Sequence, residues 1–156
     1  MSTATSIPTG FNTLTPTLVL PDAAKAIELY KKAFGATEEY RMACSESGKI
    51  MHACLQIGSS KIFLCDANPT MEGCAATHSN FYLYIDDVDS AYRQATKAGM
   101  KEAMAVEDMF WGDRVGNVKD SFGNSWTLAT HVRDVSPEEM EEGRKAFTAK
   151  KTSKAA

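Results

Sequence analysis

The segment GDRVGNVKDSFGNSW, residues 112–126, carries the strongest indication of the fold. It predicts a strand, a tight turn at SFGN and the start of a second strand, because Gly and Asn between two strand-like runs favour a hairpin. In the second strand Trp126 and Leu128 alternate with Ser125 and Thr127, so one face is apolar and the other is polar. We therefore expect Trp126 in the core and Thr127 on the opposite side of the sheet.

This hairpin ends a longer unit that occurs twice in the chain. Residues from about 79 to 131 predict a strand, a helix and three strands, and residues from about 12 to 66 predict the same order. Each helix opens at an aspartate, Asp22 or Asp87, because this side chain can cap the free N–H groups of a helix start. The sequence therefore predicts an α+β fold built from two βαβββ modules.

The remaining segments join or extend these modules. Residues 67–78 are rich in turn formers and small residues, which is typical of a linker. Residues 136–148 predict a C-terminal helix capped by Ser136, with Pro137 at its first position. We expect residues 1–156 to form a single domain with this organisation.

Composition narrows the class of protein. The chain has 156 residues, of which 44% are apolar and 24% charged, and its net charge is -3. These values are typical of a soluble globular protein and give no electrostatic footprint for nucleic acid or an anionic membrane. The sequence has no apolar run of about 18 residues and no signal-peptide layout at its start, so we expect a cytoplasmic protein. The four scattered cysteines predict reduced packing residues.

The alternating faces of the strands indicate where a ligand could bind. One helix per module can cover only one side of its sheet, and the face carrying Leu and Phe should pack against it. The opposite face is polar but mostly uncharged and includes aromatic residues, which suits a partly enclosed cleft better than a solvent-washed face. The alternative is a plain exposed sheet face. The candidate ligand contacts on this face are Thr15, Thr17, His52, Gln56, Tyr82, Tyr84 and Thr127.

Taken together, the two aspartate-led modules and the segment DRVGNVKDSFGNSWTLATH resemble the vicinal oxygen chelate superfamily of glyoxalase I, bleomycin-resistance proteins and extradiol dioxygenases. The segments TPTLVLPDAAKAIELYKKAFGA, MHACLQIG and DVSPEEM are similar to its PhnB-like, glyoxalase-like branch. The resemblance covers about residues 14–140. It implies that the modules form a curved, incomplete barrel around a cleft, commonly in a homodimer.

The resemblance also implies where a metal would bind. In metal enzymes of the superfamily, His, Gln or Glu ligands come from the first and last strands of each module. Counting from the helix-opening aspartates and from the D-x-x-G-N turn places these positions at Thr15, about Ile62, Asn80 and Thr127. None of these side chains is a strong ligand for a divalent metal. We therefore expect no metal and no other cofactor at these positions.

Histidines supply the remaining candidate chemistry. His52 is the candidate catalytic residue, as a general base or a polar ligand contact, and the alternative is a histidine with a purely structural role in the sheet. His52, His78 and His131 could converge on a displaced metal, but no local spacing supports such a site.

The segment MFWGDR, residues 109–114, predicts a loop that could border the cleft. Trp111 could form a pocket wall or pack in a dimer. Arg114 could neutralise an anionic ligand, or it could pair with Asp113 or Asp120.

Three functions are compatible with these features. The first is metal-free binding or sequestration of a small organic molecule, with that ligand and a second copy of the chain as the partners. The alternative is a lyase, isomerase or dioxygenase that uses His52 in a displaced metal site or in metal-free acid–base chemistry. A structural dimer without a ligand is the third. Nucleic acid and membranes are not expected partners.

Overall fold

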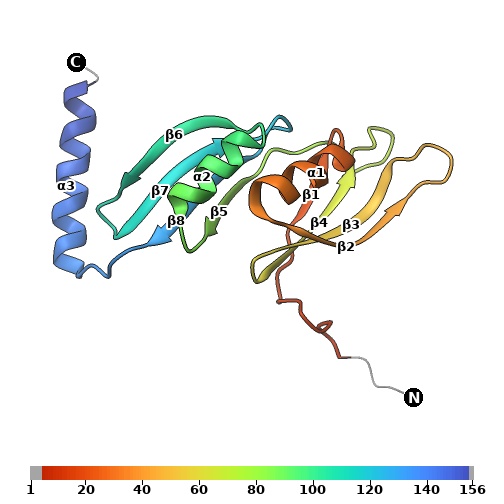
Figure 1. Ribbon diagram of the computed structural model, residues 1–156, viewed down its shortest axis with the longest axis horizontal. Coiled ribbons are helices and arrows are strands. Elements are labelled where there is room, and N and C mark those ends of the chain that lie inside the picture. The colour runs from red at the N-terminus through yellow and green to blue at the C-terminus, as the bar shows by residue number, and fades with distance from the viewer. Residues whose placement is uncertain (1–4, 155–156) are drawn as a thin grey trace.

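The computed structural model describes residues 5–154, and it confirms the predicted duplication (Figure 1). Each module is a strand and a helix followed by three strands. The first module contains β1 (Thr17–Leu20), α1 (Ala23–Phe34), β2 (Thr37–Ala43), β3 (Ile50–Ile57) and β4 (Ser60–Asp66). The second contains β5 (Asn80–Tyr84), α2 (Val88–Lys97), β6 (Lys101–Asp108), β7 (Asp113–Lys119) and β8 (Ser125–His131). The C-terminal helix α3 (Pro137–Lys154) is longer than predicted.

Each module forms an open four-stranded mixed sheet. The strand orders are β1-β4-β3-β2 and β5-β8-β7-β6, and the first strand of each module runs parallel to the last. Figure 1 shows α1 and α2 lying beside each other where the modules meet, while α3 stands at the far end of the second module. Because α1 and α2 cover one side of the sheets, the opposite side of both sheets is called the helix-free face below.

The helices form where their capping residues predict. The Asp22 side chain accepts a hydrogen bond from the Lys25 backbone N–H at 3.0 Å, and Asp87 accepts one from the Ser90 N–H at 3.1 Å. Helix α1 then buries a face of small and apolar side chains, namely Ala23, Ala26, Ile27, Tyr30 and Ala33. These contacts supply the stability that a 12-residue helix lacks on its own in water.

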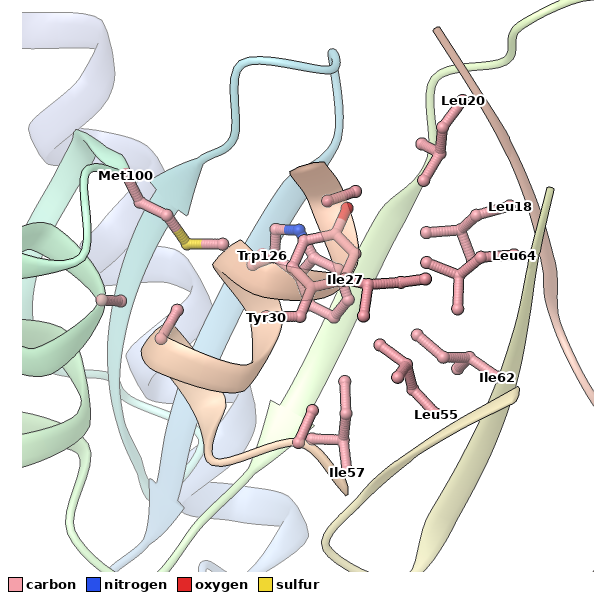
Figure 2. Close-up of a cluster of buried hydrophobic side chains, with 14 of the residues drawn as sticks. Leu18, Leu20, Ile27, Tyr30, Leu55, Ile57, Ile62, Leu64, Met100 and Trp126 are labelled. Atoms are coloured by element: carbon pink, nitrogen blue, oxygen red, sulfur yellow. The ribbon is translucent and has the colours of Figure 1, made fainter. Parts of the chain in front are cut away.

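A single apolar core runs through both modules. Figure 2 shows Ile27 and Tyr30 of α1 between the leucines of the first sheet and Trp126 of the second. The Tyr30 and Trp126 rings meet edge to face with centroids 5.0 Å apart. Trp126 is therefore a core residue, as predicted, and it packs across the join between the modules.

The predicted turn at SFGN forms, and Asp120, the residue before this turn, is hydrogen-bonded to Tyr30 of the first module. Asp120 is only 7% exposed. Its Oδ2 accepts hydrogen bonds from the hydroxyl of Tyr30 at 2.7 Å, the amide of Asn124 at 3.0 Å and the indole of Trp126 at 3.1 Å. Its Oδ1 accepts from the backbone N–H groups of Phe122 and Asn124. These residues are called the Asp120 network. Within it, burial raises the pKa of the Tyr30 hydroxyl, and the negative charge of Asp120 raises it further.

Two details of the predicted strand faces are wrong. The apolar run of residues 14–20 predicts a strand from Leu14, but β1 begins at Thr17 and the Leu14 side chain is exposed; Pro16, which has no N–H to donate to a ladder, precedes β1. Alternation along residues 50–57 predicts Met51 on the packed face and Ile50 on the opposite face, but in β3 Ile50 is buried and Met51 is exposed. The register explains this, because Ala43 pairs with Ile50 and Met42 with His52, which leaves Met51 in a bulge that shifts the alternation.

The cysteines and the helices can be compared with the expectations from composition. The four cysteines are free thiols, with Cys54 buried and the others half-buried. Within residues 5–154, the helices lack the combination of length and apolar character needed to cross a bilayer.

Candidate functional site

The helix-free face of the second sheet contains a buried carboxylate surrounded by aromatic donors. Asp113, at the start of β7, is only 3% exposed. Its Oδ2 accepts hydrogen bonds from the Tyr82 hydroxyl at 2.9 Å, the Tyr84 hydroxyl at 2.9 Å and the Trp111 indole at 3.2 Å. Its Oδ1 lies 2.8 Å from Nδ1 of His131. These five residues are called the Asp113 cluster.

The sheet topology explains how the cluster assembles. Tyr82 and Tyr84 are two residues apart in β5, so both point to the helix-free face. Strand β8 lies between β5 and β7, and its small, buried Ala129 pairs with Tyr84 on one side and with Val115 on the other. The phenol side chains can therefore extend over β8 and reach Asp113 on β7.

The cluster has a defined charge arrangement. Burial alone would raise the pKa of Asp113, but the hydrogen bonds from His131, the two tyrosines and Trp111 outweigh it and hold that pKa below its usual value. Asp113 is therefore an anion at neutral pH. Burial is the main cause that raises the pKa of Tyr82 to about 12, so the phenol remains a donor.

His131 lies between two carboxylates. Its Nε2 is 2.9 Å from Asp134, and its Nδ1 faces Asp113. The hydrogen bond to Asp134, followed by that to Asp113, raises the pKa of His131 above its ordinary value. A histidine with a carboxylate at each ring nitrogen can hold a proton and release it at the surface of the cluster.

Beyond the cluster, the same face is polar and uncharged near Thr127. The Asn117 amide donates to the Thr127 hydroxyl at 2.9 Å, and the Ser125 hydroxyl donates to the Asn117 carbonyl oxygen at 3.1 Å. Thr127 is paired directly with Tyr82 across the β5–β8 ladder. The predicted contacts Thr127, Tyr82, Tyr84 and Trp111 therefore lie on one continuous surface.

The helix-free face of the first sheet is covered mainly by aromatic rings. The His52 ring lies between those of Phe63 and Tyr40, with centroid distances of 4.6 and 5.6 Å. Phe11, from the segment before β1, packs on Phe63. Among the described residues, His52 has these ring contacts and no hydrogen-bond partner, so the structure provides no group that would orient it as a general base.

The other predicted contacts of the first module lie at different places. Gln56 donates to the Gly58 carbonyl at 3.0 Å, and Thr17 is exposed on β1. Thr15 lies just before β1 and shares with Tyr82 the lining of a mostly apolar cavity of about 260 Å³ where the modules meet. The structure thus brings Thr15 and Tyr82 together, while His52 lies in the neighbouring sheet.

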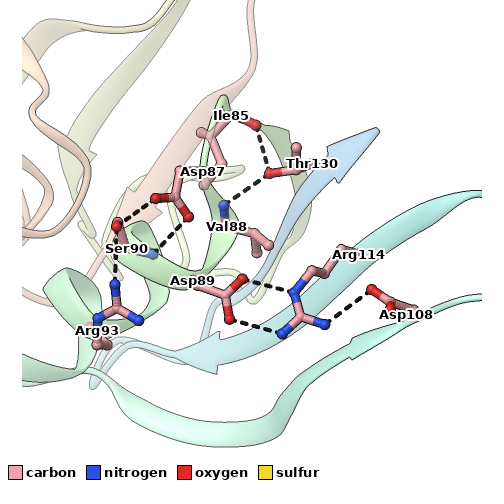
Figure 3. A network of polar contacts seen from close by, with 9 residues as sticks. All are labelled: Ile85, Asp87, Val88, Asp89, Ser90, Arg93, Asp108, Arg114 and Thr130. Atoms are coloured by element: carbon pink, nitrogen blue, oxygen red, sulfur yellow. Dashed lines mark hydrogen bonds and ion pairs between the residues drawn. The ribbon is translucent and has the colours of Figure 1, made fainter. Parts of the chain in front are cut away.

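Arg114 does not belong to this face, which corrects the prediction that it could contact a ligand. It follows Asp113 in β7 and so points to the opposite side, toward α2. Its guanidinium bonds to both carboxylate oxygens of Asp89, at 2.7 and 2.9 Å, and to Asp108 at 3.0 Å (Figure 3). Of the predicted alternative partners, Asp113 is wrong for the same geometric reason, and Asp120 lies beyond the other end of β7, where it bonds to Tyr30, Asn124 and Trp126.

The positions implied for a metal do not form a fitting donor set. Thr17 and Tyr82 are equivalent, because each lies five residues before the aspartate that caps the helix of its module. Tyr82 pairs with Thr127 and Thr17 pairs with Phe63, so Phe63 is the counterpart of Thr127 in the first module. The prediction of about Ile62 is one residue off, and Ile62 is buried on the helix side. Thr15, Phe63, Asn80 and Thr127 offer hydroxyls, an amide and a phenyl ring, which do not match a divalent metal site.

The three histidines also lie at separate places. His52 is in β3, His131 ends β8, and His78 lies in the linker beside Gly123. Within the described part of the chain, no group of three or more His, Cys, Asp or Glu side chains is arranged to hold a metal ion.

Comparisons with known proteins were consistent with this architecture. The family model described as "Glyoxalase/Bleomycin resistance protein/Dioxygenase superfamily" matches residues 11–128. An uncharacterized protein of Mycobacterium bovis is 39% identical over 136 residues, covering 82% of this chain and 89% of the relative.

Solved structures show the same fold. TioX from Micromonospora sp. ML1 aligns with a TM-score of 0.66 at 25% identity, covering 78% of this chain and 99% of TioX. A PhnB protein from Bacillus cereus aligns with a TM-score of 0.59 at 17% identity, covering 76% of this chain and 99% of that protein.

Proposed function

Because the chain belongs to the glyoxalase/bleomycin resistance protein/dioxygenase superfamily, we propose that it binds a small organic molecule on the helix-free face without a metal at the superfamily's usual positions. Within the superfamily we place it near the PhnB-like branch, whose Bacillus cereus member shares the fold. The observation that carries the proposal is the Asp113 cluster, in which one buried carboxylate fixes three aromatic side chains on a partly exposed surface.

The cluster suits binding because its aromatic side chains are oriented before a ligand arrives. Tyr82 and Tyr84 remain 47% and 61% exposed, although their hydroxyl groups are bonded to Asp113. Their ring centroids are 5.1 Å apart, so they offer a nearly continuous apolar surface. Rings held in one orientation lose little side-chain entropy on binding, which favours affinity. The neighbouring hydroxyl of Thr127 and amide of Asn117 can supply polar contacts.

We also propose that the chain forms a homodimer through apolar side chains on this face. Tyr40 and Met42 are exposed on β2 and lie on the same side of the sheet as His52. A stable interface of about 800 Å² per partner requires such apolar contacts at its centre.

Sedimentation equilibrium tests the dimer. We expect a dimer at micromolar concentration, and we expect Met42→Asp to weaken it at least tenfold because a charge would be buried at the interface. Met71→Asp, a matched change at an exposed linker methionine, should leave the dimer intact. A monomer at all concentrations, or equal behaviour of the two variants, contradicts this part of the proposal.

An enzymatic role is the second candidate, and the geometry favours His131 over His52 for it. His131 has a carboxylate at each ring nitrogen and lies in the same cluster as Tyr82 and Tyr84. Such a histidine could act as a general acid or base on a ligand bound against the rings.

A thermal-shift screen of aromatic metabolites that carry negative, zero or positive charge tests ligand binding. A ligand at a hundred times its dissociation constant adds about 2.7 kcal/mol of stability, which raises the melting temperature measurably. We expect at least one such compound, and we expect its effect to disappear in Tyr84→Ala but to persist in Met71→Ala. A screen without any response, or responses that are equal in both variants, would refute the proposal. Conversion of a bound compound, followed by NMR, would identify the enzymatic alternative.

A further inference from the structure

We infer that the Asp113 cluster selects an organic cation, such as a protonated amine or a quaternary ammonium group attached to an apolar body. This inference rests on the proposed function and adds the chemical class of the ligand. It follows from three features of the cluster: the saturation of its hydrogen-bond donors, the exposure of its ring faces and the sign of the charge around it.

The hydrogen-bond donors of the aromatic residues are already used. The hydroxyls of Tyr82 and Tyr84 and the indole N–H of Trp111 all donate to the same oxygen, Oδ2 of Asp113. A ligand that needed donors, such as a carboxylate or a phosphate, would have to displace Asp113 from them. What remains available is the π surface of the rings, which carries partial negative charge and attracts cations.

The charged groups around the rings also favour a cation. Asp86 lies with Tyr84 and His131 around a shallow depression beside the cluster, and Asp134 is on the outer side of His131. Asp113, Asp86 and Asp134 contribute three negative charges, and a protonated His131 contributes one positive charge. The local sum is therefore negative by two charges. An anion would be repelled and a cation attracted.

The nearby arginines do not change this balance at the rings. Arg114 points to the other side of the sheet and is held by Asp89 and Asp108. Arg133 follows the cluster in sequence, but its guanidinium pairs with Glu139 of α3.

The buried carboxylate also strengthens the attraction of the rings. A phenol that donates a hydrogen bond to a carboxylate shifts electron density toward its ring, so the ring face becomes more negative. Two such phenols and an indole share one carboxylate here, which no neutral acceptor would reproduce. Cation–π contacts are most favourable where Tyr or Trp faces are held close to a partly desolvated cation.

The test compares three probes of similar size by isothermal titration calorimetry at constant, low ionic strength: benzyltrimethylammonium, benzyl alcohol and benzoate. We expect the cation to bind at least tenfold more tightly than the alcohol, and benzoate to bind more weakly than either. Tyr84→Leu removes an exposed ring and should weaken the cation about tenfold, while Tyr84→Phe keeps the ring and should have a smaller effect. Met71→Ala, at an exposed methionine of the linker, is the control and should change nothing.

The variant Asp113→Asn tests whether cation binding needs the negative charge of the carboxylate or only its shape. The amide can still accept hydrogen bonds, so a variant with native near-ultraviolet circular dichroism should bind benzyl alcohol as before and lose at least tenfold in affinity for the cation. If this variant does not fold, the comparison of Tyr84→Leu with Met71→Ala still tests the inference. Equal affinities for the cation and the alcohol, tighter binding of benzoate, or cation binding unaffected by Tyr84→Leu would each overturn the inference. If a ligand from the screen binds through Tyr84 while the cation does not, the inference fails and the proposed function stands.

Discussion

Asp120→Ala is expected to destabilise the protein by about 3–5 kcal/mol, because it leaves several buried donors without an acceptor. The Asp120 carboxylate accepts five hydrogen bonds, and one of them comes from Tyr30 in the other module. Small domains have unfolding free energies of about 5–15 kcal/mol, so the change removes a large share of the total. Urea unfolding followed by far-ultraviolet circular dichroism measures it.

Two further variants separate the network from the loss of a charge. Tyr30→Phe removes the two hydrogen bonds that the Tyr30 hydroxyl makes with the other module, one to Asp120 and one from the Asn124 amide, and should cost about 1–3 kcal/mol. Asp108→Ala removes a carboxylate whose side chain is 72% exposed in its pair with Arg114, and it should change stability by less than about 0.5 kcal/mol. An Asp120→Ala variant within 1 kcal/mol of the wild type would show that the network contributes little to the join between the modules.

The fold was predictable because it depends on local signals. Capping aspartates, helical periodicity and the hairpin at SFGN each act over a few residues, and the structure confirms all three. The failures came from features that one strand alone does not reveal. The bulge at Met51 depends on its partner strand β2, and the position equivalent to Thr127 depends on register, which places Phe63 there instead of Ile62.

The candidate site was predictable only in part. Alternation along β5 placed Tyr82 and Tyr84 on the correct face, and the loop sequence indicated Trp111. The sequence does not identify their common partner directly, because Asp113 is the first residue of β7 and its neighbour Arg114 suggests an ion pair between the two. The available signal was that Asp113 and Arg114 are adjacent in a strand, so their side chains must point to opposite faces.

The loop that holds Trp111 and Asp113 depends on a backbone conformation that only glycine adopts readily. Gly112 has a φ of +94°, and a Cβ at this position would overlap the carbonyl oxygen of Arg133. The Gly112 carbonyl accepts hydrogen bonds from the backbone N–H groups of Val132 and Arg133, at 2.9 and 3.1 Å. The loop is thereby fixed to the chain that follows His131, so a shift of Gly112 would move both sides of the Asp113 cluster.

Gly112→Ala should therefore cost about 2–5 kcal/mol, since the strain of a positive φ is added to a steric overlap with backbone that cannot rotate away. Gly48→Ala is the matched control: its φ of +70° imposes similar strain, but a Cβ there has open space around it, so the expected cost is about 1–2 kcal/mol. Urea unfolding gives both values, and the tryptophan near-ultraviolet signal should change in Gly112→Ala alone. If the two variants lose equal stability and both keep the wild-type signal, the contact between Gly112 and Arg133 does not position the aromatic residues around Asp113.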